Sequence, residues 1–534
     1  MSTRERVNSA VVGENCVAED NCASIRSNLV RILNYLGTIR IRQSTAGRCF
    51  RCNVVENHPS QLNEIVVTSQ RRSENLQTIP LSVTAAIATE LLNEGPQIRL
   101  PCRRQCRRCH TRNAEQDFSF ARLVSITSWR NVNGSVLLDQ DATPLEVVRA
   151  SYVQHDKTIT EEVHLLSKSG AMPRIAGIYY FNDLSAYDPL DLMGEAAAPL
   201  DETQIWSAQK SKSYAAFWQI NPKIAADTHL TLGARYTKDD RMVRGSTLGV
   251  RGPESLSLGG ASHSASWTKP TWRIALDRQF MPDVMGYIFD DRRFKSGVHN
   301  LLTYSATPVA PETLDAYQLG IKTEIADHRV RLNAAAFYYN YKDIQLQEIA
   351  TGAIMLVSAA AAEMKGIDVD FAFLPFDTLT VRGGFEIMSS HYTNFRNAPF
   401  FRPTLGPNGE PAGGNPQSVG NATGFDAVRA PKETANISAA YRVQVPSGSL
   451  NFVVSDYYNS GFAWDSINRL RQLSYDVANA SVEWLAPKNA WGVRLWAKYL
   501  FGAQYCRFET AGTLNDTCSP APPRTYGMTL SANF

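Results

Sequence analysis

From residue 117 to the carboxyl end, apolar and polar residues alternate in one segment after another. In THLTLGARYTKDDR, Leu230 and Leu232 share one face of an extended chain, while Thr231 and Gly233 share the other. The same alternation recurs in DAYQLGIKTEI, VRLNAAAFYYNYKD, IDVDFAF, LTVRGGFEI, WGVRLWAKY and RTYGMTLSANF. A period of two is typical of β-strands that have one apolar and one polar face. The sequence therefore predicts an all-β fold over residues 117–534.

The lengths of the segments and of the turns between them distinguish two kinds of β fold. Strands of about five or six residues suffice for a soluble sandwich or propeller. The segments here reach about ten residues, which is long enough to cross a bilayer at a tilt. Long tracts such as 396–424 alternate with short turns such as VPSGS. We count about 16 to 18 segments, and the pattern favours an antiparallel transmembrane β-barrel over a soluble fold.

The alternation also predicts side-chain orientation, because a shift of one residue would turn every apolar side chain inward. The residues predicted to face outward are Leu230, Leu232, Leu332, Leu379, Val381, Leu495 and Leu530. Tyrosines near segment ends are predicted to form girdles at the membrane surfaces: Tyr236, Tyr338, Tyr339, Tyr341, Tyr392, Tyr457, Tyr458 and Tyr499. The acid pairs at 239–240 and 290–291 lie where segments run into loops, and we predict solvated turn ends there.

Composition and motifs argue against several classes of function. The net charge of +3 gives no electrostatic reason to expect a nucleic acid partner. No apolar run reaches the ~18 residues of a helical membrane span, and the charged amino end lacks the apolar region of a secretory signal. No nucleophile elbow, phosphate loop, dinucleotide fingerprint or metal-ligand spacing of histidines appears. We therefore predict that the chain is not an enzyme and holds no cofactor or metal.

The first 116 residues differ from the rest in composition. Seven of the nine cysteines lie before residue 110, and RLPCRRQCRRCHTR at 99–112 contains six arginines. Cys106, Cys109 and His110 match the c-type haem attachment pattern, but no compact helical domain surrounds them, and we favour chance over haem or over zinc with Cys49 and Cys52. Residues 1–62, which are unassigned, and the basic link 86–116 carry no sustained periodicity, so we predict irregular structure for both.

The carboxyl end, PPRTYGMTLSANF, resembles the last strand of TonB-dependent outer-membrane receptors, in which Phe534 would be the terminal aromatic residue that signals barrel assembly. YLFGAQYCRFETAGTLNDTC resembles their penultimate strand and final loop, although Gly502 stands where an Asp is common. Further similar stretches are 176–181, 213–241, 294–297 and PETLDAYQLGIKTEI, so the resemblance covers residues 117–534. The compartment outside the cell is oxidising, and we expect Cys506 and Cys518, in the loop before the last strand, to form a disulfide there.

Residues 63–85 resemble the segment that precedes such barrels. EIVVT, comprising Glu64, Ile65, Val66, Val67 and Thr68, is similar to the TonB box, by which these receptors bind the periplasmic protein TonB. Main-chain pairing to an exposed sheet edge explains the need for a short β-branched run. QRRSENLQTIPLSVTA then resembles the start of the plug domain that fills the barrel lumen.

The resemblance implies a monomeric receptor in the Gram-negative outer membrane, in contact with its lipid, for active uptake of a scarce nutrient such as a ferric siderophore. The chain departs from the family after residue 85, because a plug and early barrel strands should follow there. We therefore predict a truncated or degraded receptor with an incomplete barrel, although no signal peptide is visible. A passive outer-membrane pore and a non-functional remnant are the alternatives.

Overall fold

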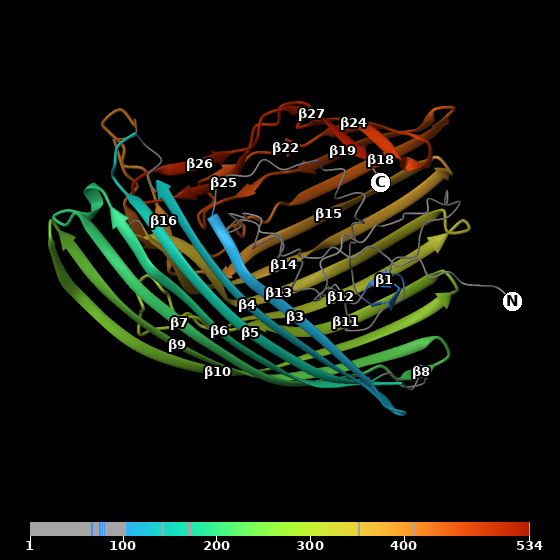
Figure 1. Cartoon of the computed structure of the whole chain (residues 1–534), viewed down its shortest axis with the longest axis horizontal. Coiled ribbons are helices and arrows are strands. Elements are labelled where there is room, and N and C mark those ends of the chain that lie inside the picture. Colours follow the sequence, from blue (N-terminus) through green and yellow to red (C-terminus); the bar gives the residue numbers. More distant parts are fainter. Residues whose placement is uncertain are drawn as a thin grey trace.

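The computed structural model of the chain describes residues 66–67, 74–75, 77, 79–80, 103–139, 144–168, 174–350, 353–410 and 412–532. Within these residues the regular structure is almost entirely β-strand, and one long antiparallel sheet curls round on itself (Figure 1). No helix of the described part is long and apolar enough to cross a membrane. The predicted all-β, antiparallel barrel architecture is confirmed.

The described part of the sheet has seventeen strands of seven or more residues. They are β3 (Arg103–Asp117), β4 (Ala121–Asp139), β5 (Arg149–Ser167), β6 (Arg174–Met193), β7 (Glu202–Ile220), β9 (Thr228–Arg251), β10 (Glu254–Met281), β11 (Val284–Lys295), β12 (Glu312–Ile325), β13 (Val330–Ala350), β14 (Ala353–Phe376), β15 (Leu379–Asn394), β18 (Glu433–Val445), β19 (Gly448–Asn459), β23 (Asn479–Leu485), β24 (Trp491–Lys498) and β27 (Thr525–Ala532). Shorter elements are β1 (Val66–Val67), β2 (Glu74–Asn75), η2 (Glu195–Ala197), β8 (Lys223–Ala225), β16 (Ala398–Phe401), β17 (Gln417–Gly420), β20 (Phe462–Ala463), β21 (Arg471–Gln472), β22 (Tyr475–Asp476), η3 (Pro487–Asn489), β25 (Cys506–Ala511) and β26 (Asp516–Pro520).

A seam separates the first strand of the barrel from the last. Sixteen antiparallel pairings link the strands from β3 to β27, so these two end strands run in the same direction. The strand order places β27 beside β3, but the described residues of the two strands share no paired register. The barrel is therefore not closed by an antiparallel ladder at this seam.

The two faces of the sheet differ as the alternation predicts. On the outer face Leu332, Leu495 and Leu530 are 43%, 52% and 68% exposed. Val381 is paired with the exposed Phe373 and thus shares that face. The inner face is mostly polar or small, with buried residues that include Thr231, Thr237, Asp239, Gln318, Lys322, Arg331 and Asn333.

Several tyrosines of the predicted girdles face inward instead. Tyr236 and Tyr338 are exposed on the outer face. Tyr339 and Tyr341 pack against an inner apolar cluster, and Tyr392 is 1% exposed against Phe395. The girdle prediction is wrong for these three residues. Tyr339 follows the outward Tyr338, so it points inward, and Tyr341, two residues further along, shares its face. Tyr392 packs in an apolar cluster with Ala422 and Ala427 of the connection 395–432.

The basic segment 86–116 is not irregular throughout. Residues 103–117 form β3, which pairs with β4 from Arg103 opposite Ser135 to Asp117 opposite Arg122. The sheet therefore begins at residue 103, before the predicted boundary at 117. The apolar alternation is missing from β3, but a strand at the margin of a sheet is formed by main-chain bonds and needs no apolar face. Residues 1–62 lie outside the described residues.

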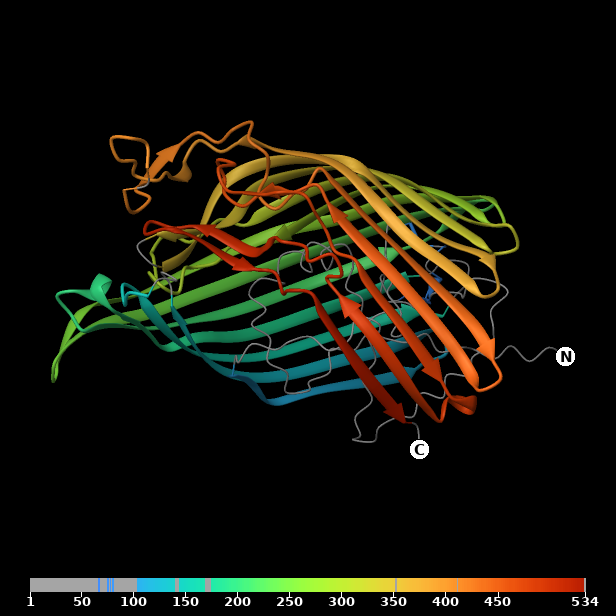
Figure 2. The ribbon, with the colours of Figure 1, turned by 90° about the horizontal axis from the view of Figure 1, so that it is seen from above.

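The two ends of the barrel differ in the length of their connections. At one end adjacent strands are joined by short turns such as 282–283, 377–378 and 446–447. At the other end lie the long connections 296–311, 395–432, 460–478 and 499–524. Figure 2 shows the long connections extending from one end of the sheet, with 395–432 in orange. The last strand, β27, ends at the short-turn end.

Candidate functional site

Two residues of the predicted plug remnant lie against the inner wall of the barrel. Ile79 is 1% exposed and belongs to an apolar cluster with Tyr287, Phe289 and Leu314. The carbonyl oxygen of Pro80 accepts a hydrogen bond of 2.7 Å from Nη2 of Arg273 on β10. A short stretch that follows the predicted TonB box is thus anchored on strands β10 to β12.

The anchoring arginine is part of a buried charge network. Asp291 on β11 accepts from Nη1 of Arg273 at 2.7 Å and from Nη2 of Arg293 at 2.6 Å. The Asp291 side chain is 3% exposed, and the Arg273 guanidinium lies 4.7 Å from the ring centroid of Phe289. Asp291 is therefore not the solvated turn end that the sequence suggested, and Asp239 is also buried. Neighbouring side chains in a strand point to opposite faces, so one acid of each pair lies on the inner face of the sheet.

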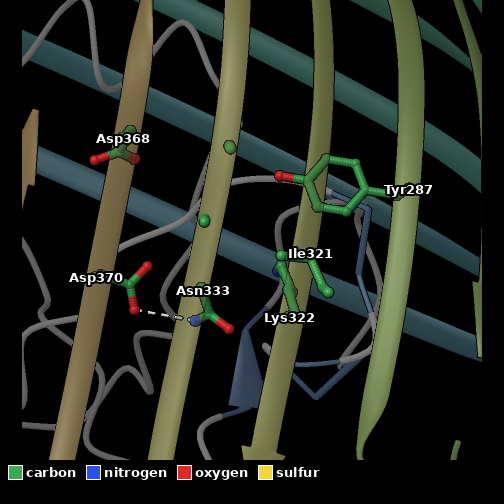
Figure 3. Close-up of a pocket in the computed structure, with 8 residues that line it drawn as sticks. Tyr287, Ile321, Lys322, Asn333, Asp368 and Asp370 are labelled. Carbon is green, nitrogen blue, oxygen red and sulfur yellow. Dashed lines mark hydrogen bonds between the residues drawn. The ribbon is translucent and has the colours of Figure 1, made fainter. Parts of the chain in front are cut away.

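A second set of polar side chains surrounds a small cavity on the inner wall of the barrel. Figure 3 shows Tyr287, Lys322, Asn333, Asp368 and Asp370 around one space, which has a volume of about 10 Å³ and also borders Ile321, Ala334 and Ala335. Nδ2 of Asn333 donates to Oδ2 of Asp370 at 3.0 Å, while Oδ1 of Asn333 is buried without a partner. A cavity of this size holds about one water molecule.

The ring of Tyr287 reaches this cavity because the residue opposite it is glycine. Tyr287 is paired with Gly320, and a Cβ atom added at Gly320 would lie 2.4 Å from Cζ of the tyrosine. The ammonium group of Lys322 lies 5.9 Å from the centroid of the same ring. The absence of a side chain at Gly320 therefore sets the position of Tyr287, and with it the shape of the cavity.

Replacement of Gly320 by Ala is expected to destabilise the barrel by about 1–3 kcal/mol, because the tyrosine ring must leave its position. Gly233→Ala is the matched control, since its Cβ atom would meet nothing closer than 3.5 Å. The measurement is the urea midpoint of the folded barrel in detergent. Equal midpoints for the two variants would contradict the role of Gly320.

The connections at the long-loop end are tied to one another, and we call residues 395–432, 460–478 and 499–524 the outer loop cluster. The Asp516 carboxylate accepts from Nδ2 of Asn415 at 2.9 Å and from both terminal nitrogens of Arg469 at 2.7 Å. Asn468 pairs with the main chain of Asp426 through two bonds of 2.9 Å. Three segments that are far apart in the sequence thus form one connected unit.

Aromatic rings enclose a cation inside this cluster. The guanidinium of Arg429 lies 5.0 Å from the ring centroid of Trp464 and 5.3 Å from that of Phe508. Burial lowers the pKa of Arg429. Burial raises the pKa of Asp465, although the amides of Leu470 and Arg469 donate to its carboxylate and act in the opposite direction. The site combines a cation, aromatic faces and carboxylates at the mouth of the barrel.

Cys506 and Cys518 form a disulfide in this cluster, with their Cα atoms 5.6 Å apart. The bond joins β25 to β26, which pair as a small hairpin. Cys109 of the haem-like pattern is itself disulfide-bonded and lies in β3, which leaves it no free thiol for a haem thioether. No cluster of three or more metal-ligating side chains occurs among the described residues.

Replacement of both Cys506 and Cys518 by Ser is expected to loosen the hairpin. Closure of a loop of about 15 residues restricts the opened chain by about 3 kcal/mol in the chain-entropy model. This effect acts on local opening of the hairpin, because β25 and β26 form a separate sheet outside the barrel sheet. Limited proteolysis should then cleave within 506–518 much faster, while the urea midpoint of the barrel stays unchanged. Reductant should raise cleavage within 506–518 of the wild type to the rate of the double variant, and it should not change the rate at this segment in the double variant. An unchanged cleavage rate would contradict this.

The remaining predicted sites are placed only in part. Val66 and Val67 form β1, which pairs antiparallel with Glu74 and Asn75 of β2. Glu64, Ile65 and Thr68 of the predicted TonB box, and the terminal Phe534, lie outside the described residues. The sequence did not single out Arg273, Lys322 or Asn333. The signal it offered was a polar residue at an inward position between outward apolar ones, and nearly every strand contains several of these.

Comparison with known proteins agrees with this architecture. The family model described as TonB dependent receptor-like, beta-barrel matches residues 110–500. Curated relatives include pesticin receptors of Yersinia enterocolitica and Yersinia pestis, each 26% identical over 239 residues, which is 43% of this chain and 30% of the relative. The chain thus matches less than a third of the length of these relatives.

Solved structures with a similar fold have low sequence identity. The ferric yersiniabactin uptake receptor FyuA of Yersinia pestis has a TM-score of 0.67 at 16% identity, with 80% of this chain and 61% of that chain covered. The siderophore receptor PiuA of Acinetobacter baumannii has a TM-score of 0.60 at 13% identity, with 79% and 63% covered. These likenesses show the fold, and the family match covers well over half of the chain. The chain belongs to the TonB-dependent receptors, through their β-barrel domain.

Proposed function

We propose that this chain is an outer-membrane receptor that takes up an iron complex, such as a ferric siderophore, with energy supplied through TonB. The family match and the titles of the similar structures, which name siderophore receptors, support this class of ligand. The observation that carries the proposal is the contact between Pro80 and Arg273, because it connects the segment after the TonB box to the barrel wall.

The contact suggests how force would act on this chain. TonB would bind Glu64–Thr68 as an added strand, through main-chain hydrogen bonds. A pull on that strand would be transmitted along the chain to Ile79 and Pro80. Breaking the Arg273 bond and exposing Ile79 would then release this segment from the wall.

The outer loop cluster is the proposed place of first contact with ligand. It lies at the end opposite the β27 terminus and presents cationic and aromatic groups next to one another. Arginine binds carboxylate groups well, and aromatic faces contact planar rings. An iron complex with acidic and aromatic groups would therefore suit this cluster.

The test is uptake of radiolabelled iron by cells that lack their own receptors and express this chain. A panel of ferric siderophores that includes ferric yersiniabactin serves as the probe. Uptake that stops when the proton-motive force is dissipated supports the proposal. Diffusion of ligand that persists without the proton-motive force, together with steady conductance in liposomes, would instead indicate a passive pore.

A further inference from the structure

Five cations gather on the outer face of the barrel at the long-loop side of its apolar band. They are Lys157 on β5, Lys210 and Lys212 on β7, and Lys238 and Arg244 on β9, and we call them the basic patch. Side chains two residues apart share a face of a strand. The patch therefore continues the outward positions of Tyr214, Tyr236 and Ile159, each of which is at least 36% exposed.

The register brings these cations together. Lys238 is directly opposite Tyr214, and Lys212 is opposite Asp240. Lys210 is opposite Leu184 of β6, and Leu184 is opposite Lys157 of β5, so the patch spans four adjacent strands. The ring of Tyr214 lies 5.4 Å from that of Tyr180, which marks the aromatic boundary of the apolar band below the cations.

Among the described residues, four of these five cations have no ion-pair partner. Nζ of Lys238 lies 3.8 Å from Oδ1 of Asp240, which also accepts from Ser266 at 2.7 Å. In the described part of the chain, Lys157, Lys210, Lys212 and Arg244 form no ion pair. Of the two neighbouring acids, Asp239 is buried on the inner face, and Asp240 is one outward carboxylate beside five cations.

Another side of the barrel shows the contrasting arrangement. On the outer face of β11 to β14, Arg292 donates to Asp315 at 2.8 Å, and Lys342 lies 3.8 Å from the same carboxylate. Lys365 is paired with Glu363 at 3.0 Å. Outward cations at that height are thus balanced by acids within the chain, whereas the basic patch is not.

We propose that the basic patch binds the phosphate groups of lipid headgroups in the outer leaflet of the membrane. This rests on the proposed outer-membrane location, with the long loops outside. Lysine ammonium groups bind phosphate as compact point charges, and clusters of them recognise anionic lipids. Their aliphatic stems lie along the apolar surface while the charged ends reach the headgroup layer.

The experiment measures binding of diphosphoryl lipid A to the full chain in neutral detergent by native mass spectrometry. The variant Lys210→Gln/Lys212→Gln/Lys238→Gln is compared with the control Lys342→Gln/Lys365→Gln, and resistance to urea checks that both are folded. The triple variant should bind on the order of 100-fold more weakly, since each lysine near an anionic surface contributes about fivefold. The control should bind like the wild type.

Further arms separate lipid from free phosphate and guard against misfolding. Inorganic phosphate at equal concentration should not compete, and monophosphoryl lipid A should bind more weakly than the diphosphoryl form. If the triple variant does not fold, the single variant Lys212→Gln is used, and it should bind about fivefold more weakly. Equal loss in the control, no loss in the variant, or full competition by inorganic phosphate would each overturn the proposal. Iron uptake is measured separately, so its failure is distinguishable from loss of lipid binding.

Discussion

Val67→Pro is expected to reduce TonB-coupled uptake to the background level. Proline has no main-chain N–H group, so it removes a donor from any strand that pairs with the box, and its fixed φ angle disfavours regular pairing. The box is short, and its binding depends on main-chain bonds, so one lost donor affects a large share of the contact. Crosslinking of purified TonB to this segment, and energy-dependent uptake of radiolabelled iron, should both be lost.

Two controls make this result specific to coupling. Val67→Ile keeps the N–H group and the β-branched side chain, so it should crosslink and transport like the wild type. Val67→Pro should still bind ligand at the cell surface, because the outer loop cluster lies at the far end of the barrel. Uptake by Val67→Pro at the rate of wild type would exclude Glu64–Thr68 as the coupling segment. If the wild type crosslinked to TonB yet accumulated no iron, the chain would be the non-functional remnant considered above.

The fold was predictable from the sequence wherever one face of a strand is apolar. Leu332, Leu495 and Leu530 alternate with polar residues, and the lipid-facing side needs this pattern, so their orientation follows from local sequence. The strand β3 was not predictable in this way, because both of its faces are polar and only its main-chain pairing to β4 makes it a strand.

The candidate site was much less predictable, because its residues meet only through the register. Arg273 and Asp291 are paired across β10 and β11, and Pro80 comes from a distant part of the chain. Asn415 meets Asp516 across two long connections. No local pattern encodes such contacts. The two cysteines were an exception, since their chemistry and the expected compartment were enough to suggest the disulfide.

The largest effect on stability is expected for Asp291→Ala. Asp291 is 2% exposed, and its carboxylate lies between the guanidinium groups of Arg273 and Arg293, whose side chains are 13% and 19% exposed. Its removal takes away the negative charge that holds these two cations close together. Breaking a buried ion pair on one side costs about 3–5 kcal/mol, because the remaining charge is neither solvated nor paired. The urea midpoint of the folded barrel in detergent should fall accordingly.

Two further variants test whether the cost arises from the loss of the shared carboxylate between the two arginines. Asp377→Ala removes a carboxylate that is 54% exposed and pairs with Arg329 at the short-turn end, so it should cost at most about 1 kcal/mol. Arg273→Met/Asp291→Leu/Arg293→Met replaces the whole network by apolar side chains of similar size, and such replacements are often neutral or stabilising. It should recover most of the lost stability, yet it removes the donor to Pro80 and so should release the anchored segment. If Asp291→Ala and Asp377→Ala lowered the midpoint equally, the network would not hold the inner wall together as argued.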